Sequence, residues 1–183
     1  HWVIADRQTA GRGRRGRVWN DGAGNFMGSV LVKATGQVQQ LSFVAALALH
    51  DALSALTGQP ARFTLKWPND VLWDQAKLSG ILVEATRASA APSSSDHHVV
   101  IIGIGLNLRD ATTISQNTQR AIADWSSIAE HSQQASLARC SDIVAKVAQS
   151  LYLSLNHVTA QGFADLPTRY AQVDALIGQQ VHI

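Results

Sequence analysis

Cysteine is almost missing from this sequence, because Cys140 is the single one among 183 residues. An intrachain disulfide is therefore excluded, and with it the class of small secreted domains that disulfides hold together. No charged and apolar leader precedes the first strand-like segment, so we expect a cytoplasmic protein. Long apolar runs are missing as well. The longest, residues 43–49 and 99–106, fall short of the ~20 residues of a membrane-spanning helix, so we expect no membrane span.

Acidic residues are missing from one stretch in particular, between Arg7 and Trp19. The formal net charge of the whole chain is only +2, so the positive charge is local and marks one site. Residues 11–17 read Gly-Arg-Gly-Arg-Arg-Gly-Arg. Glycine lets this Gly/Arg loop bend sharply, and arginines together with backbone N–H groups favour the binding of an anion. Taken alone, the same run is also typical of a nonspecific nucleic-acid contact.

The composition is that of one globular domain, because 46% of the residues are apolar. Apolar patterns predict strands at residues 2–5, 26–33, 62–67, 71–73, 77–85 and 99–108, the last one fully buried. Helical spacing predicts a helix at residues 39–56 and mostly helical structure after residue 124, including helices at 137–155 and 163–170. We further expect a surface loop at residues 88–98. Ser136 is expected to be an N-cap, His50 a surface or capping residue, and Cys140 a buried thiol.

Three polar spots fall at the ends of predicted strands or in the turns between them. They are the Gly/Arg loop, the stretch from Lys66 through Asp70 to Lys77, and the stretch from Gly103 to Asn107. Such spots can converge on one cleft, and their residue types suit a phosphate or carboxylate beside a nucleotide with Mg²⁺. Glycines inside an apolar strand indicate that something approaches the backbone closely. The sequence contains no Walker A loop, no complete dinucleotide fingerprint and no visible Ser-His-Asp arrangement.

Four segments, in this order, resemble motifs of the catalytic domain of the biotin protein ligases. They are Gln8-x-x-Gly11-Arg12-Gly13-Arg14-Arg15-Gly16-Arg17-x-Trp19, Lys66-Trp67-Pro68-Asn69-Asp70, Lys77-Leu78-x-Gly80-Ile81-Leu82-Val83-Glu84 and Gly103-x-Gly105-Leu106-Asn107. The resemblance implies an α+β fold in which helices flank a mixed β-sheet. This biotin/lipoate ligase catalytic fold is similar to that of class II aminoacyl-tRNA synthetases.

In this family, the carboxylate of biotin attacks the α-phosphate of ATP to give biotinyl-5′-AMP and pyrophosphate, and a lysine of a carboxyl carrier protein then takes the biotinyl group. The resemblance therefore implies a ligase that uses biotin, ATP and Mg²⁺. It implies Lys77 and Arg12 as catalytic residues. The implied biotin contacts are Gln8, Gly11, Arg12, Arg14, Lys77, Gly80, Gly103 and Gly105. The implied nucleotide contacts are Arg14, Arg17, Trp19, Lys66, Asp70 and Asn107, with Asp70 also holding Mg²⁺.

The resemblance also predicts the domain organisation and the partners. Residues 1–175 are expected to form the catalytic domain without its first segment, and residues 176–183 to begin a small β-barrel domain. The expected acceptor is the biotin carboxyl carrier domain of acetyl-CoA carboxylase. A homodimer is an open alternative, and neither a membrane nor a nucleic acid is expected as a partner of this stretch. Two other functions stay open. One is a lipoate-type ligase with the same two-step chemistry, and the other is a nucleic-acid-binding module with a steep salt dependence.

Overall fold

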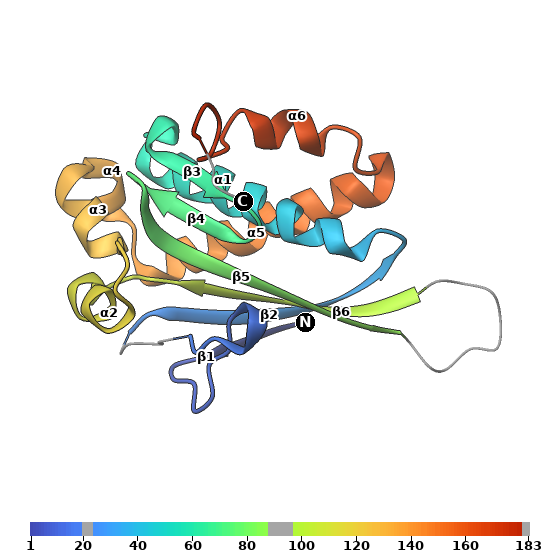
Figure 1. Ribbon diagram of the computed structural model, residues 1–183, viewed down its shortest axis with the longest axis horizontal. Helices are drawn as coiled ribbons and strands as arrows, with labels where there is room; N and C mark the ends of the chain where they lie inside the picture. Colours follow the sequence, from blue (N-terminus) through green and yellow to red (C-terminus); the bar gives the residue numbers. More distant parts are fainter. Residues whose placement is uncertain (20–23, 88–96, 181–183) are drawn as a thin grey trace.

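The computed structural model describes residues 1–19, 24–87 and 97–180. These residues form a six-stranded sheet whose neighbouring strands run antiparallel in the order β1-β2-β6-β5-β4-β3 (Figure 1). The strands are β1 (Trp2–Ala5), β2 (Phe26–Thr35), β3 (Phe63–Lys66), β4 (Asp70–Trp73), β5 (Ala76–Arg87) and β6 (His97–Leu106). Parallel pairing among the described residues is limited to the bridges Leu65–Asp174 and Lys77–Ile122. The predicted α+β architecture is confirmed.

Helices cover one face of this sheet and one of its ends. α1 (Leu41–Thr57) and α5 (Cys140–Gln161) pack against each other, and α1 also contacts β3, β4 and β5. The shorter helices are α2 (Ala111–Thr118), α3 (Trp125–His131), α4 (Gln133–Leu137) and α6 (Leu166–Ala171), with 3₁₀ turns at Arg14–Gly16, Val38–Gln40 and Pro60–Arg62. Figure 1 shows α2, α3 and α4 together at one end of the sheet. The opposite face of the sheet carries the Gly/Arg loop.

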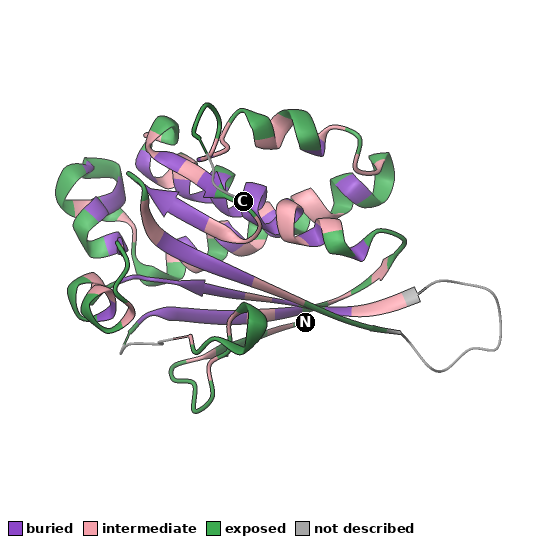
Figure 2. Ribbon diagram, viewed as in Figure 1, coloured by how far each residue is buried: buried purple, intermediate pink, exposed green. Residues whose placement is uncertain are grey.

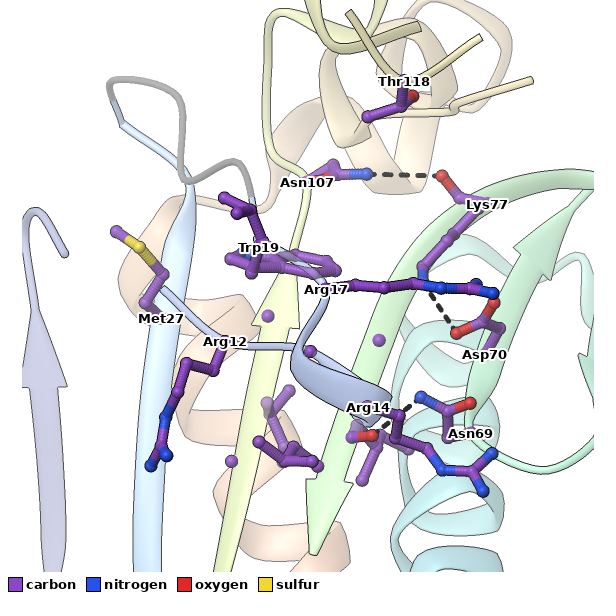
Figure 3. A pocket seen from close by; sticks show the side chains of 18 of the residues that line it. Arg12, Arg14, Arg17, Trp19, Met27, Asn69, Asp70, Lys77, Asn107 and Thr118 are labelled. Atoms are coloured by element: carbon purple, nitrogen blue, oxygen red, sulfur yellow. Dashed lines mark hydrogen bonds and ion pairs between the residues drawn. The ribbon is translucent and has the colours of Figure 1, made fainter. Parts of the chain in front are cut away.

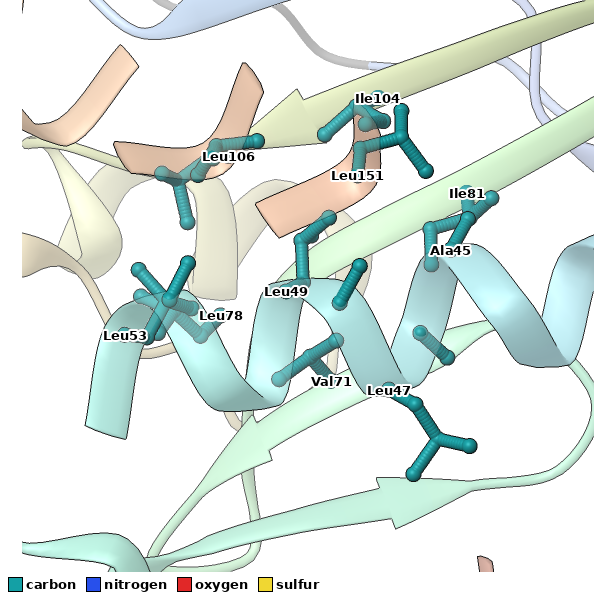
Figure 4. Close-up of a cluster of buried hydrophobic side chains, with 14 of the residues drawn as sticks. Ala45, Leu47, Leu49, Leu53, Val71, Leu78, Ile81, Ile104, Leu106 and Leu151 are labelled. Atoms are coloured by element: carbon teal, nitrogen blue, oxygen red, sulfur yellow. The ribbon is translucent and has the colours of Figure 1, made fainter. Parts of the chain in front are cut away.

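The hydrophobic core lies between the sheet and the two long helices. Alternation along β5 and β6 directs Ile81, Ile102 and Ile104 toward α1 and α5, and all three are almost completely buried. Figure 4 shows Leu49 and Leu53 of α1 and Leu151 of α5 meeting these strands, and Figure 2 shows the burial concentrated there. This packing places the core on one face and leaves the other face open.

The central helix α1 is apolar on nearly all sides because it is enclosed. Of its 17 residues, most are buried, and it ends where Gly58 adopts a left-handed conformation with φ of 68°. The stretch Val38–Thr57 has the length and composition of a membrane-spanning helix, with a mean hydropathy of 1.2, although 61% of it is buried inside the molecule. A helix in the centre of a globular core has the same properties, and α1 occupies that position.

The edge strand β3 is covered by the chain that follows α6. The backbone N–H of Leu65 donates to Val173, and that of Ala175 donates to Leu65, at 2.7 and 2.9 Å. This pairing satisfies an edge that would otherwise be exposed. Residues 176–178 form turns, whereas residues 181–183 lie outside the described residues. The β-barrel expected to begin at residue 176 therefore stays a prediction.

Five local predictions are wrong. Helix α5 begins at Cys140 with Arg139 as its N-cap, so Ser136 does not cap it and instead lies within α4. Cys140 is exposed, because the buried side of α5 begins only at Ile143. His50 is buried on α1, where its ring packs edge-on against Phe63.

The fourth error concerns only the last two residues of the loop expected at residues 88–98. Residues 97 and 98 belong to β6, and residues 88–96 lie outside the described residues. The fifth error concerns β6, which was expected to be fully buried. It lies inside the sheet, but Ile101 on its open face is 41% exposed.

Candidate functional site

A cavity of about 1100 Å³ lies on the open face of the sheet, beneath the Gly/Arg loop. Every predicted site residue except Gly11 lines it, so the three polar spots of the sequence do converge. Figure 3 shows the loop passing over strands β6 and β5, with Arg17 extending toward Asp70 and Arg14 lying near Asn69. The cavity is therefore walled by the loop on one side and floored by the sheet on the other.

The Gly/Arg loop is closed by the residues on either side of it into a hairpin of residues 11–19, which we call the arginine hairpin. Trp19 donates its backbone N–H to Gly11 at 3.0 Å, Gly13 donates to Arg17 at 2.7 Å, and Arg12 and Val18 form an antiparallel bridge. At the tip, Arg15 adopts a left-handed conformation with φ of 57°, which only a few percent of non-glycine residues do. The missing side chain of Gly11 leaves room for the carbonyl of Trp19, since a Cβ there would lie 2.6 Å from that oxygen. Gly11 thus supports the hairpin from behind the cavity wall.

The indole of Trp19 lies directly over Gly80 and Gly105. These two glycines are cross-strand partners on β5 and β6. The indole nitrogen Nε1 is buried and has no hydrogen-bond partner among the described residues. An unsatisfied buried donor costs about 1–3 kcal/mol, so an acceptor supplied by a ligand would stabilise this arrangement.

Lys77 reaches the cavity because β5 contains a β-bulge. The register steps from Val71 opposite Ser79 to Leu72 opposite Lys77, so Leu78 is an extra residue in β5. Simple alternation from Ile81 and Ser79 would turn Lys77 toward the core. The extra residue resets the alternation, so Leu78 is fully buried in the core and Lys77 lines the cavity.

Asp70 holds the amino group of Lys77. The Nζ of Lys77 lies 2.7 Å from Oδ1 of Asp70, and both side chains are 19% exposed. The contact is a partly buried ion pair. The Nζ of Lys77 also lies 5.4 Å from the centre of the Trp19 ring. Lys77 is therefore fixed between a carboxylate and an aromatic face, close to the middle of the cavity.

Positive charge dominates the rim. Arg12 is loosely paired with Glu84 at 3.4 Å, an exposed contact that contributes little to stability. Arg14, Arg15 and Arg17 are exposed, and none of them pairs with an acid among the residues that the structure describes. Such unneutralised guanidinium groups around a cavity favour an anionic ligand.

Asn107 and Asn69 brace the cavity rather than point freely into it. The side-chain amide of Asn107 donates to the carbonyls of Lys77 and Ala123, both at 3.3 Å, and that of Asn69 donates to Ile81 at 2.9 Å. These bonds hold the ends of β4, β5 and β6 together. Because its amide protons are used by the protein, Asn107 can contact a ligand only through its oxygen.

The sequence did not reveal the wall contributed by α2 and the segment after it. Asn117, Thr118 and Arg120 line the cavity there, yet they follow the last strand in an ordinary helical pattern that carries no chemical signal. Met27 and Ser29 of β2 were missed for a different reason. They line the floor because alternation places them on the same face as Gly103 and Gly105.

A second cavity, of about 680 Å³, lies between α1 and α6 and contains none of the predicted site residues. Phe43, Phe163 and Tyr170 make it mainly apolar. Burial raises the pKa of Tyr170 well above its ordinary value, and the carboxylates of Asp174 and Asp70 add to this shift. The phenol therefore stays neutral. This cavity lacks the cations of the first one.

The proteins that resemble this chain in sequence and fold include several ligases. A family model described as the biotin/lipoate A/B protein ligase family matches residues 1–107. The chain is 48% identical over 113 residues to a biotin–[acetyl-CoA-carboxylase] ligase of Paracoccus denitrificans, covering 60% of this chain and 45% of that protein. It is 28% identical over 184 residues to the bifunctional ligase/repressor BirA of Escherichia coli, covering 98% of this chain and 53% of that protein.

Among solved structures, the biotin protein ligase from Aquifex aeolicus in complex with biotin and ATP is similar, with a TM-score of 0.77 and 28% identity. The alignment covers 95% of this chain and 68% of that one. The chain spans about half the length of the two curated relatives. Since the family model covers more than half of the sequence, and the four motifs meet at one cavity, this chain belongs to the biotin/lipoate A/B protein ligase family.

Proposed function

We propose that this chain carries the catalytic site of an ATP-dependent biotin protein ligase, which activates biotin as biotinyl-5′-AMP and transfers it to a lysine of a carrier protein. The observation that carries the proposal is the convergence of Arg12, Arg14, Arg17 and Lys77 on one cavity above a glycine floor. The named relatives support biotin as the acid that is activated.

The first reaction requires two anions to approach each other. A carboxylate oxygen of biotin attacks the α-phosphorus of ATP, the bond from that phosphorus to the bridging oxygen breaks, and pyrophosphate leaves. Cations fixed in advance stabilise the charge that builds up on the phosphate oxygens. Lys77 is suited to this role because Asp70 and Trp19 already hold its amino group. Arg12 would give up its ion pair with Glu84 and contact the incoming carboxylate or phosphate instead. The free energy lost is small, because the existing ion pair is exposed.

In the second reaction, the neutral amine of a carrier lysine attacks the acyl carbon of the adenylate. A new amide bond forms, AMP leaves with the electrons of the acyl–oxygen bond, and the amine loses a proton. The mixed anhydride must meanwhile be kept from water. The arginine hairpin lies over the cavity and would provide that cover.

The remaining assignments follow the positions of the motifs. Gln8, Gly11, Arg14, Gly80, Gly103 and Gly105 are proposed for biotin, and Arg14, Arg17, Trp19, Lys66, Asp70 and Asn107 for the nucleotide. Of these, Gly11 acts through the hairpin, because it does not line the cavity. Asn107 contributes through its oxygen alone.

Magnesium would enter with the nucleotide. The described residues contain no cluster of three or more acidic, histidine or cysteine side chains that could hold a metal by themselves. Mg²⁺ bound to a triphosphate needs only one or two protein carboxylates, so a single Asp70 fits this mode. When bound, the ion would offset negative charge on the phosphates. Asp70 would then hold the ion in addition to Lys77.

The proposed acceptor is the carboxyl carrier domain of acetyl-CoA carboxylase, which the name of the Paracoccus relative suggests. A cytoplasmic location, a homodimer, and the absence of membrane and nucleic-acid partners stay predictions. The clustering of arginines around one cavity supports a small anionic ligand over an extended nucleic acid, which needs phosphate contacts spread across a surface.

The function is tested by incubating the chain with ATP, Mg²⁺ and biotin and measuring pyrophosphate. We expect pyrophosphate release that depends on biotin, followed by biotinylation of added carrier domain. Lipoate in place of biotin is the comparison that separates the two branches of the family. Release with lipoate alone would reassign the substrate, and no release with either acid would contradict the proposal.

Lys77→Ala tests the role of the lysine. We expect pyrophosphate release to fall by about 10²–10³-fold, the usual effect of removing one preorganised donor. Lys33→Ala is the matched control, since Lys33 is exposed on β2 and does not line the cavity. Equal activity of both variants would remove Lys77 from the mechanism.

A further inference from the structure

Gly80 and Gly105 are covered by a side chain of the protein itself. A Cβ built on Gly80 would lie 2.8 Å from Cζ3 of Trp19, and one built on Gly105 would lie 2.9 Å from its Nε1 and still closer to two ring carbons. Contacts of this kind below 3.0 Å essentially do not occur in proteins. No side chain fits at either position while the indole lies there.

Backbone conformation does not explain these glycines. Neither one has a φ in the left-handed range, so any residue could adopt their backbone angles. Gly103 offers an internal comparison, because it lies on the same strand and the same face, two residues before Gly105. A Cβ there would meet the Leu82 carbonyl at 3.6 Å and the Ser29 hydroxyl at 3.7 Å, both ordinary contacts. The requirement for glycine therefore follows the position of the indole.

The indole is joined directly to the arginine hairpin. Trp19 pairs through its backbone with Gly11, and the neighbouring bridge joins Val18 to Arg12. The arginine side chains beyond this ladder add little to holding the hairpin, because Arg14, Arg15 and Arg17 are exposed. The stacking of Trp19 on the sheet is thus the main apolar contact that holds the hairpin over the cavity.

We propose that Gly80 and Gly105 serve as a seat for Trp19, and that Trp19 is a positioning residue that holds the arginine hairpin in place over the cavity. Gly80 and Gly105 then act on the ligand through the tryptophan and the hairpin, which replaces the direct biotin contact proposed above for these two glycines. The contact between Trp19 and the two glycines forms without a ligand. The proposal rests on the proposed function only where biotin is used as a readout.

A double-mutant cycle on the ligand-free chain tests the seat. The variants are Gly105→Ala, Trp19→Ala and the combination, and the readout is the rate of trypsin cleavage at Arg14, Arg15 and Arg17, identified by mass spectrometry. We expect Gly105→Ala to speed cleavage about tenfold or more, because an added methyl group has no room. In the Trp19→Ala background the same change should add nothing, because the cause of the clash is gone.

Gly103→Ala is the matched control, and its hairpin should be cleaved at the wild-type rate. If Gly105→Ala fails to fold, recovery of folding in Trp19→Ala/Gly105→Ala would show the same coupling. Additive effects of the two changes would overturn the proposal, and so would unchanged cleavage in Gly105→Ala. Trp19→Phe keeps an aromatic ring and should retain most of the protection against trypsin. If only the size of the side chain mattered, this smaller residue would protect the hairpin less.

Biotin supplies the second readout. Gly105→Ala and Trp19→Ala should raise KM for biotin by similar factors, without a further increase in the combination, while kcat changes less. Independent multiplication of the two effects on KM would mean that Gly105 contacts biotin directly. If the wild-type chain has no activity with biotin, the proposed function fails, whereas the cleavage cycle still decides whether the glycines seat Trp19.

Discussion

Strand β6 presents different surfaces on its two faces, although the residues alternate along one chain. Ile102 and Ile104 face α1 and α5 and are almost fully buried. Ile101, Gly103 and Gly105 face the open side, where they line the cavity under the arginine hairpin. The same alternation recurs on β5, where Ile81 faces the core. The covered face supplies stability, whereas the open face is kept nearly bare so that Trp19 and a ligand can approach the backbone.

This difference separates stability from function within single strands. Filling the covered face with branched apolar side chains gives the sheet a rigid support. The open face can then hold glycines and paired charges that contribute little to folding. Variants placed on neighbouring residues of β6 and its surroundings can break or sharpen this separation.

Ile102→Ala should have the largest effect on folding. The side chain is fully buried, and its truncation should lower the free energy of unfolding by about 2–5 kcal/mol through lost burial and a cavity. Ile101→Ala is its neighbour on the open face and should cost less than about 1 kcal/mol, because the side chain is 41% exposed. Urea unfolding measures both. An equal loss of unfolding free energy in the two variants would show that both faces of β6 contribute equally to stability.

Arg12→Ala should weaken biotin binding while leaving stability nearly unchanged, the reverse of what is expected for Ile102→Ala. Its exposed pair with Glu84 contributes little, so the free energy of unfolding should change by less than about 1 kcal/mol. Biotin binding, measured by calorimetry, should weaken by about tenfold or more, since hydrogen bonds to charged groups contribute about 1.5–3 kcal/mol. Lys33→Ala again serves as the control on the open face. A stable Arg12→Ala chain with unchanged affinity would contradict the assigned contact.

Replacing Asp74, which lies away from both faces of the sheet, should have the smallest effect on stability. A hydrogen bond from Arg62 lowers the pKa of Asp74, and burial opposes part of that shift. A carboxyl group whose pKa is lower in the folded state stabilises the fold above its unfolded pKa of about 3.9, and this contribution is lost as the pH falls through the folded value.

The difference in melting temperature between the wild-type chain and Asp74→Asn should therefore be constant from about pH 5 to 7 and shrink as the pH falls below about 4. Asparagine also tolerates the left-handed backbone at this position, where φ is 45°. A difference that persists at low pH would show that charge is not its source.

Much of the fold could be predicted because its signals are local. Apolar alternation located all six described strands, and the helical spacing of α1 was clear before Gly58. The convergence of the four motifs followed from their positions at strand ends, and the structure brings them to one cavity. Their roles toward biotin and ATP stay predictions.

Features that depend on tertiary contacts could not be predicted. The extra residue Leu78 turns Lys77 toward the cavity, and a single bulge leaves no mark on the apolar pattern. Gly105 indicated a close approach to the backbone, but only the structure shows that Trp19 makes that approach. The exposure of Cys140 likewise depends on where α5 begins relative to the core, which helical spacing alone does not determine.

Hydrogen–deuterium exchange with biotin and ATP tests most directly whether the open face of the sheet is the ligand site. The account predicts added protection at residues 11–19 and at the cavity ends of β5 and β6, including Gly80 and Gly105, with little change in α1 and α5. Protection confined to the apolar cavity beside α6, or no change on the open face, would contradict it.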